Sequence, residues 1–388
     1  MTGYLLVVSK YRDDVFGGLF FEGLPAQLRS RVRLVEFGRE ALTAGLAGAS
    51  AVLVMRHGLF AFGHLASCAA WARVPRYYFL DDNYILHNEE PEIHGPYWSA
   101  FTDDHVRQTL RGFSGVLLGS APLMRYFEEH ALHPRLIPYP PIAWPVLRAR
   151  ENGWSRSAGE PFRIAFFGGE LRRDVFMRCV YPAAQRLAED RAVELVLAGI
   201  DPDGMPAPTG QLHLTHLPYD VRYGPALAAL ADRRPDALAH PTLPSNNNQY
   251  KNANVLINAR SAGAVAVLSN MPPYDTLGAP PPALLCDNTP DAWFDAFERL
   301  ARDPDLCART FDNASRYCDA HFSGRENAEV IRRILDAHPA PGPASRAFRR
   351  VIAGPTLGFD RVLVGMKNLA RRSALARAAA RRLGYGAA

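Results

Sequence analysis

The sequence has few cysteines and no long apolar segment. Its five cysteines are odd in number and widely spaced, at Cys68, Cys179, Cys286, Cys307 and Cys318. This pattern favours reduced thiols over a disulfide framework or a zinc site. No apolar run reaches the roughly 18 residues that a membrane span needs, and MTGYLLVVSKYRDD at the N-terminus lacks the basic region and cleavage site of a signal peptide. We therefore expect a cytoplasmic protein.

Charge is also sparse and unevenly distributed. Charged residues make up 21% of the 388 residues and apolar residues 48%, which excludes a disordered chain and predicts two or three domains with full cores. The net charge of +5 averages two different parts of the chain. Residues 341–388 carry +9, with Asp360 as their one acidic residue, and the remainder carries −4.

The basic tail contains a candidate amphipathic helix. As a helix, residues 361–383 would place apolar side chains on one side and Lys367, Arg371 and Arg382 opposite. This pattern is typical of a helix that docks on anionic lipid at the inner face of a cell membrane. A solvated terminus fits it equally well. Nucleic acid is not an expected partner, because no motif that binds RNA or DNA accompanies the charge.

Apolar strands alternate with helical patterns in two series. The first series predicts one doubly wound domain over residues 1–145. Its expected strands are 4–9, 32–37, 51–55, 76–80 and 115–119, and its clearest helices are 60–72 and 121–130. Prolines then interrupt the pattern, so residues 146–160 are interpreted as a linker.

The second series predicts another doubly wound domain over residues 161–340. Its expected strands are 163–167, 193–198, 212–217, 237–240, 264–269 and 283–286, and its helices are 175–189, 224–231, 250–262, 290–302 and about 307–337. The predicted class is α/β, with two Rossmann-like domains facing a central cleft.

Residues 240–277 are the most informative stretch. An Asn-rich loop leads into the expected helix 250–262, which ends at Gly263 before a short apolar strand. At 100° per residue, Lys251, Asn254, Asn258 and Ser261 share one polar stripe of this helix. The loop and the helix start should lie at the carboxyl edge of a parallel sheet, where such sheets bind ligands and where a nearby lysine suits phosphate.

The same stretch resembles the donor-binding segment of a known enzyme family. The residues that match its motif are Asn248, Lys251, Asn252, Gly263, Ser269, Pro273 and Tyr274. They resemble the retaining GT-B glycosyltransferases of the group 1, or family-four, class, and weaker similarity extends over about residues 75–335. The resemblance implies a GT-B fold and transfer of a sugar from a nucleotide-diphosphate sugar, with retention and without a metal or cofactor. The acceptor would be a cell-envelope glycan, polysaccharide, lipid-linked or protein molecule.

A glycine loop is the first part of the expected donor site. Gly168 and Gly169 follow a predicted strand and precede Arg172 and Arg173, so backbone amides and a guanidinium could meet a diphosphate. A tight turn followed by solvated arginines is the alternative. The resemblance favours Arg173, because the family motif has an Arg-Asp pair and Asp174 follows.

The second part comes from the 240–277 stretch. The resemblance implies that Lys251 binds the diphosphate with Arg173, and that Asn248 holds the loop or the donor sugar. Asn254 is assigned to the donor side with the rest of the polar stripe. Asn258 occupies the place of the glutamate that holds the donor ribose, and a neutral amide is a weaker acceptor than a carboxylate. A non-catalytic sugar- or nucleotide-binding protein with the same fold is therefore the alternative function.

The acceptor side is expected in the first domain. Asp82, with Asp81 and Asn83, follows a predicted strand and could contact sugar hydroxyls. An N-cap or a salt bridge would explain these residues equally well. His57 follows the strand 51–55 and either lines the acceptor side or is structural.

No metal site is expected. Asp201 and Asp203 form an Asp-x-Asp triplet, but the neighbouring Pro202 indicates a turn. His213 and His216 are three apart on a predicted strand, which places them on opposite faces.

Overall fold

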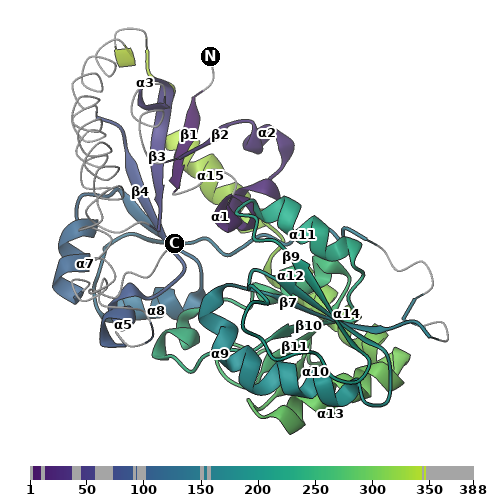
Figure 1. The fold of residues 1–388 in the computed structure, drawn as a ribbon. Helices are drawn as coiled ribbons and strands as arrows, with labels where there is room; N and C mark the ends of the chain where they lie inside the picture. The colour runs from purple at the N-terminus through teal and green to yellow at the C-terminus, as the bar shows by residue number, and fades with distance from the viewer. Residues whose placement is uncertain are drawn as a thin grey trace, which may run out of the picture. The chain divides into compact units, whose positions relative to one another are not determined.

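The chain divides into two separately packed units (Figure 1), each of which has its own parallel sheet. Unit 1 comprises Met1–Arg12, Pro25–Tyr139 and Asn327–Ala388, and unit 2 comprises Asp13–Leu24 and Pro140–Glu326. The computed structural model describes residues 3–9, 14–36, 45–56, 73–90, 93, 102–148, 153–154, 159–342 and 345–346. His57, the expected helix 60–72 and the expected helix 361–383 lie outside the described residues.

Unit 1 contains a six-stranded parallel sheet of order β2-β1-β3-β4-β5-β6. Its strands are β1 (Tyr4–Ser9), β2 (Val32–Glu36), β3 (Ala49–Met55), β4 (Arg76–Leu80), β5 (Gly115–Leu118) and β6 (Leu136–Pro138). Its helices are α2 (Ala26–Arg29), α3 (Leu46–Gly48), α5 (Tyr84–Glu89), α7 (Asp103–Leu110), α8 (Ala121–Glu129) and α15 (Arg325–Ala337), which starts in unit 2. Strands β3 and β5 are buried throughout, as their continuous apolar sequences predict.

Unit 2 contains a second six-stranded parallel sheet, of order β12-β11-β10-β7-β8-β9. Its strands are β7 (Phe162–Phe167), β8 (Val193–Ala198), β9 (Leu212–Leu217), β10 (Ala237–His240), β11 (Val265–Ser269) and β12 (Leu284–Cys286). Its α-helices are α1 (Val15–Gly17), α9 (Arg173–Val175), α10 (Tyr181–Leu187), α11 (Tyr223–Asp232), α12 (Val255–Ala262), α13 (Pro290–Arg302) and α14 (Pro304–His321). Two 3-10 helices, η4 (Glu170–Arg172) and η6 (Asn246–Tyr250), and two π-helical turns, η1 (Gly18–Glu22) and η5 (Phe176–Val180), complete it.

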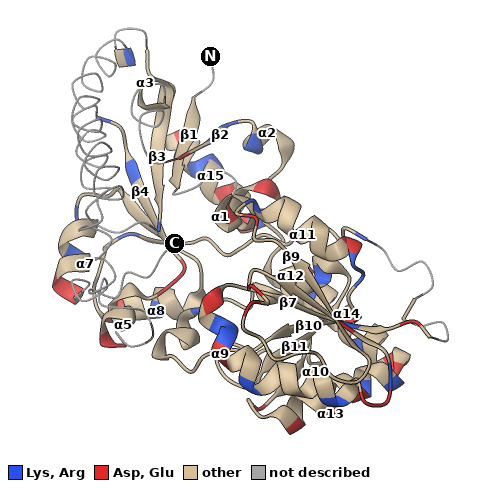
Figure 2. Ribbon diagram, in the orientation of Figure 1, with Lys and Arg blue, Asp and Glu red and all other residues tan. Residues whose placement is uncertain are grey.

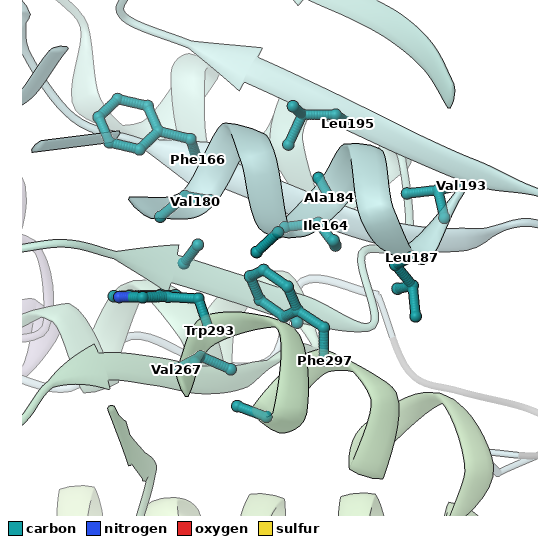
Figure 3. Packing of buried hydrophobic residues seen from close by; sticks show 14 of the residues in the cluster. Ile164, Phe166, Val180, Ala184, Leu187, Val193, Leu195, Val267, Trp293 and Phe297 are labelled. Carbon is teal, nitrogen blue, oxygen red and sulfur yellow. The ribbon is translucent and has the colours of Figure 1, made fainter. Parts of the chain in front are cut away.

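Helices cover both faces of the sheet in unit 2, with α11 and α12 on one face and α10 and α13 on the other (Figure 1). Trp293 and Phe297 of α13 are fully buried in one cluster with Ile164 and Phe166 of β7, and the Phe297 ring lies next to Ile164 (Figure 3). Thr289 caps α13 by accepting a hydrogen bond from the Ala292 amide at 3.3 Å. This core fixes the direction in which β7 leaves the sheet and therefore where the glycine loop begins.

The prediction of a helix over residues 250–262 is wrong at its N-terminal end. The helix α12 begins at Val255, and Lys251 is extended, with φ −82° and ψ 166°. Ser245 accepts a hydrogen bond from the Asn247 amide at the start of the separate 3-10 turn η6, and Asn248 within that turn donates to the preceding Leu243 carbonyl. These side-chain bonds stabilise the turn in place of a longer helix. The polar stripe is therefore broken. Ser261 is fully buried and donates a hydrogen bond to the Trp144 carbonyl at 3.5 Å.

A short helical segment between β1 and β2 packs within unit 2. The Trp144 indole donates to the Gly18 carbonyl at 2.8 Å, and the Ile142 amide donates to the Leu19 carbonyl at 2.6 Å. A Cβ atom on Gly18 would lie 2.2 Å from the Tyr223 ring. The sequence predicted one domain over residues 1–145, whereas this segment belongs to unit 2. Helical periodicity reveals that a segment has a buried face, but it does not reveal which sheet covers that face.

Candidate functional site

The order of strands in unit 2 defines a switch point. From β7 the chain runs to β8 and β9 on one side, then returns to β10 on the other side of β7. Such a reversal leaves a crevice at the carboxyl ends of the two central strands, where open α/β sheets bind ligands. Gly168 and Gly169 follow β7, and the loop leading to Lys251 follows β10. The structure thus brings the two predicted parts of the donor site to one edge.

The glycine loop is held from one side and open on the other. The Gly168 amide donates to the Ala198 carbonyl at 3.0 Å. Gly199 has φ +97° and lies so close to the glycine loop that a Cβ atom on Gly199 would be 2.2 Å from the Gly168 carbonyl oxygen. A Cβ atom on Gly169, by contrast, would have no neighbour within 4 Å among the described residues. Gly169 therefore leaves its backbone approachable at the carboxyl edge.

Arg173, the arginine favoured by the sequence analysis, is occupied by other groups. Its Nη1 atom donates to Glu170 at 3.0 Å and to the Asp201 carbonyl at 2.7 Å, and its Nη2 atom donates to the Asp203 carbonyl. Figure 2 shows acidic and basic residues next to one another at the start of α9. Asp203 also donates its amide to the Asp201 carboxylate at 2.9 Å, which confirms the predicted turn. Arg173 therefore fastens this turn to the start of α9.

Arg172 has a different environment. Its Nε atom is buried and has no hydrogen-bond partner among the described residues. Its charge lowers the pKa of His240, and it counteracts the burial that raises the pKa of Tyr274 to about 12. Lys251 also lowers the pKa of His240 by its charge. The charges of Arg172 and Lys251 therefore both act on His240 at the end of β10, which favours Arg172 over Arg173 as the second cation of the candidate site.

His240 was missed by the sequence analysis. It is the last residue of β10 and only 8% exposed, and its ring packs edge-on against Tyr274 with centroids 5.9 Å apart. Burial first, and then the charges of Arg172 and Lys251, lower its pKa well below the ordinary 6.5. Its position at the carboxyl end of a predicted strand could have identified His240 from the sequence. That inference also required the order of strands in the sheet, which the sequence did not provide.

A closed set of hydrogen bonds supports the loop after β10. The Thr242 amide donates to the Ser269 hydroxyl at 2.8 Å, and that hydroxyl donates to the Asn288 side-chain oxygen at 2.7 Å. The Asn288 side-chain nitrogen then donates back to the Thr242 carbonyl at 3.0 Å. These bonds tie together the ends of β10, β11 and β12. Ser269, a residue of the predicted motif, is thus a supporting residue.

No family model and no curated protein sequence matches this chain. Among solved structures, HepE from Anabaena in complex with UDP and glucose aligns with a TM-score of 0.58 at 12% identity, over 86% of this chain and all of that one. Sucrose-phosphate synthase from Thermosynechococcus elongatus gives the same four values. A glycosyltransferase from Rickettsia africae aligns with a TM-score of 0.52 at 11% identity, over 86% of this chain and 99% of that one. The fold is GT-B.

The asparagines that the sequence predicted for the donor site make different contacts. Asn248 is buried and donates to the Leu243 carbonyl at 2.6 Å, so it holds the loop, one of its two predicted roles. Asn254 is the residue before α12 but makes no capping hydrogen bond with its side chain. Asn258 accepts a hydrogen bond from the buried Tyr223 hydroxyl at 2.6 Å. The side-chain oxygen at the expected ribose position is thus already engaged within the protein.

Replacing Tyr223 by phenylalanine should lower the free energy of unfolding by about 1 kcal/mol, because one buried hydrogen bond is lost and the Asn258 oxygen is left unpaired. Urea denaturation followed by circular dichroism would measure the change. The matched control is Tyr219→Phe, since Tyr219 is 74% exposed and its variant should differ from wild type by less than about 0.5 kcal/mol. Equal stabilities of the two variants would contradict a stabilising role for this bond.

The two aspartates predicted for the acceptor side in unit 1 are engaged in ion pairs. Arg56 contacts Asp82, and its Nε atom lies 3.0 Å from Asp81. The Tyr84 hydroxyl donates to the Arg56 carbonyl at 2.7 Å. Asn83 caps α5 by accepting from the Ile85 amide at 3.2 Å. The alternatives of a salt bridge for Asp82 and an N-cap for Asn83 are therefore confirmed, and an acceptor role for Asp82 stays a prediction.

Among the described residues, no helix is both long enough and apolar enough to cross a bilayer. The same part of the chain holds no group of three or more His, Cys, Asp or Glu side chains arranged to bind a metal ion.

Proposed function

We propose that this protein is a glycosyltransferase that moves a sugar from a nucleotide-diphosphate sugar to an acceptor. The observation that carries the proposal is the convergence of the Gly168–Gly169 loop, Arg172 and Lys251 at the switch point of unit 2. HepE, which has the same fold, was solved with UDP-glucose. An anionic donor of this kind suits an edge that offers two cations and approachable backbone.

The chemistry requires stabilisation of a leaving group. When the bond at the anomeric carbon breaks, negative charge grows on the diphosphate, and fixed cations at that position lower the barrier. Arg172 and Lys251 supply this charge from two different loops. Arg173 positions the adjacent turn through the Asp201 and Asp203 carbonyls. Asn248 supports the loop that carries Lys251, and Asn254 and Asn258 border the ribose side.

We also propose the stereochemistry of transfer, its independence of a metal, the class of acceptor and a membrane-bound location. Transfer would proceed with retention and without a metal, as the family resemblance implies, and the acceptor would be a cell-envelope, polysaccharide or protein molecule. The tail at 341–388, with its charge of +9, would hold the enzyme on an anionic membrane surface. The anomeric configuration of the product, determined by NMR, tests retention, and sedimentation with anionic vesicles tests membrane binding.

Lys251→Ala should weaken the binding of UDP-glucose or another accepted nucleotide sugar about tenfold, or 1.4 kcal/mol, because one cation next to the diphosphate is lost. Calorimetric titration would measure it. Arg186→Ala removes an exposed arginine of α10 that pairs with Asp291 and is not part of the proposed donor site, so this variant should bind as wild type does. Failure of the wild-type protein to bind or turn over any member of a nucleotide-sugar panel would refute the proposed function.

A non-catalytic binding protein is the second candidate. It is favoured by Asn258, whose side-chain oxygen accepts from Tyr223 at the position where the family resemblance implies a ribose-binding glutamate. The two candidates differ in turnover rather than binding. Binding of a nucleotide sugar without transfer or hydrolysis, in the presence of cell-envelope extracts as acceptor, would select the binding protein.

A further inference from the structure

His240 and Arg172 each have a buried polar atom that no hydrogen bond satisfies among the described residues. The Nδ1 atom of His240 and the Nε atom of Arg172 are both buried, and neither has a hydrogen-bond partner among the described residues. Two such groups are costly, because each gave up its hydrogen bonds with water on folding. His240 is the last residue of β10, and Arg172 lies in the loop that follows the adjacent strand β7. Buried unsatisfied groups at a ligand-binding edge indicate that a ligand completes them.

The charge of that ligand follows from the surroundings of His240. The charged and titratable groups that act on the imidazole come from three loops: Arg172 after β7, Lys251 after η6, and Tyr274 after β11. Two of these are cations, and the third is a phenol whose pKa lies at about 12, so it is neutral. An anion with several acceptor oxygens would satisfy the Arg172 Nε atom and the His240 Nδ1 atom together, next to the charge of Lys251. A phosphate has that charge and geometry.

We propose that the His240 imidazole binds a phosphate oxygen of the nucleotide sugar and takes up one proton from solvent as the phosphate binds. This inference rests on the proposed function and adds a residue and a pH dependence to it. The bound imidazolium would face the phosphate oxygens as a third cation. It would then also stabilise the charge that grows on the departing diphosphate.

The direction of the pH effect follows from the electrostatics. In the free protein, burial and two cations keep the pKa of His240 well below 6.5, so the imidazole is neutral at pH 7. A bound phosphate neutralises the cations and raises this pKa. Since the complex then binds more protons than the free protein, affinity must rise as the pH falls from the bound pKa toward the free pKa.

The test uses the full-length protein and UDP-glucose, or whichever nucleotide sugar the wild type binds, because each phosphate of such a ligand carries one fixed charge near neutral pH. Affinity should increase about three- to tenfold between about pH 8 and about pH 6, within the tenfold per pH unit that one proton permits. Calorimetry in two buffers of different ionisation enthalpy should show uptake of a substantial fraction of a proton at the lower pH.

His240→Gln retains hydrogen-bonding capacity but cannot ionise, so its affinity should change less than about twofold over this range, with proton uptake near zero. His213→Gln, an exposed histidine on the edge strand β9, is the control and should keep the wild-type pH profile. If His240→Gln does not fold, His240→Asn replaces it.

The outcomes separate the two hypotheses. Binding by wild type without proton uptake, or an unchanged pH profile in a folded His240 variant, overturns the role of His240 and leaves the proposed function standing. Absence of binding by wild type across the nucleotide-sugar panel overturns both.

Discussion

Replacing Arg172 by alanine should weaken nucleotide-sugar binding about thirty- to a hundredfold, which corresponds to about 2 to 2.7 kcal/mol. The guanidinium can form two charge-assisted hydrogen bonds with one phosphate, and its Nε atom is already buried without a partner among the described residues. The lost affinity should therefore exceed that of Lys251→Ala. Calorimetric titration with UDP-glucose would measure it, and the rate of transfer should fall by at least the same factor.

The neighbouring arginine provides the matched comparison. Arg173→Ala removes the same charge one residue along the chain, but the Arg173 side chain bonds to Glu170 and to the carbonyls of Asp201 and Asp203. The affinity of the Arg173→Ala variant for a nucleotide sugar should stay within about threefold of wild type, while the free energy of unfolding of this variant falls by about 1 kcal/mol. A larger loss of affinity for Arg173→Ala than for Arg172→Ala would restore the choice made from the sequence.

Gly199→Ala should lower the free energy of unfolding by about 2 to 4 kcal/mol, because two penalties add at one residue. The backbone has φ +97°, which L-amino acids with a side chain rarely adopt, and the new Cβ atom would lie 2.2 Å from the Gly168 carbonyl oxygen. Relief of that clash must displace either β8 or the glycine loop. Urea denaturation would measure the stability, and nucleotide-sugar affinity should fall as well because Gly168 moves.

Gly278→Ala is the control for the backbone penalty alone. Gly278 has φ +80°, but a Cβ atom there would have no neighbour within 4 Å in the part of the chain that the structure describes, so its variant should lose only about 1 kcal/mol. Equal losses at the two glycines would mean that the contact with Gly168 is relieved without cost. The glycine loop would then be more pliable than its packing against Gly199 indicates.

The fold was largely predictable because its elements are encoded locally. The strands at Tyr4–Ser9, Arg76–Leu80 and Val193–Ala198 have the bounds that their apolar runs predict. Their burial on both faces leaves little freedom for another assignment. The start of α12 was predicted wrongly, since Ser245 and Asn248 side chains bond to the loop backbone and compete with the helix that the periodicity indicated.

The candidate site was only partly predictable. The motif at 240–277 identified Lys251, and the strand followed by two glycines identified the loop at 168–169. The choice between Arg172 and Arg173 depended on which guanidinium binds the Asp201–Asp203 turn. The Asp201 carbonyl that accepts from Arg173 is 28 residues away in the sequence, so no local pattern reveals this contact. The ion pair of Asp82 was equally hard to predict, because its partner Arg56 follows a different strand and lies 26 residues earlier in the sequence.

The sequence by itself determined the α/β class, the position of nearly every described strand, and the segment that carries the expected donor site. These features depend on the periodicity and composition of short stretches, which act over a few residues. Only the tertiary structure decided that His240, Arg172 and Lys251 share one edge, and that Tyr223 engages Asn258. The order of strands within the sheet sets these neighbours, and that order results from the packing of the whole unit around its core rather than from any local pattern.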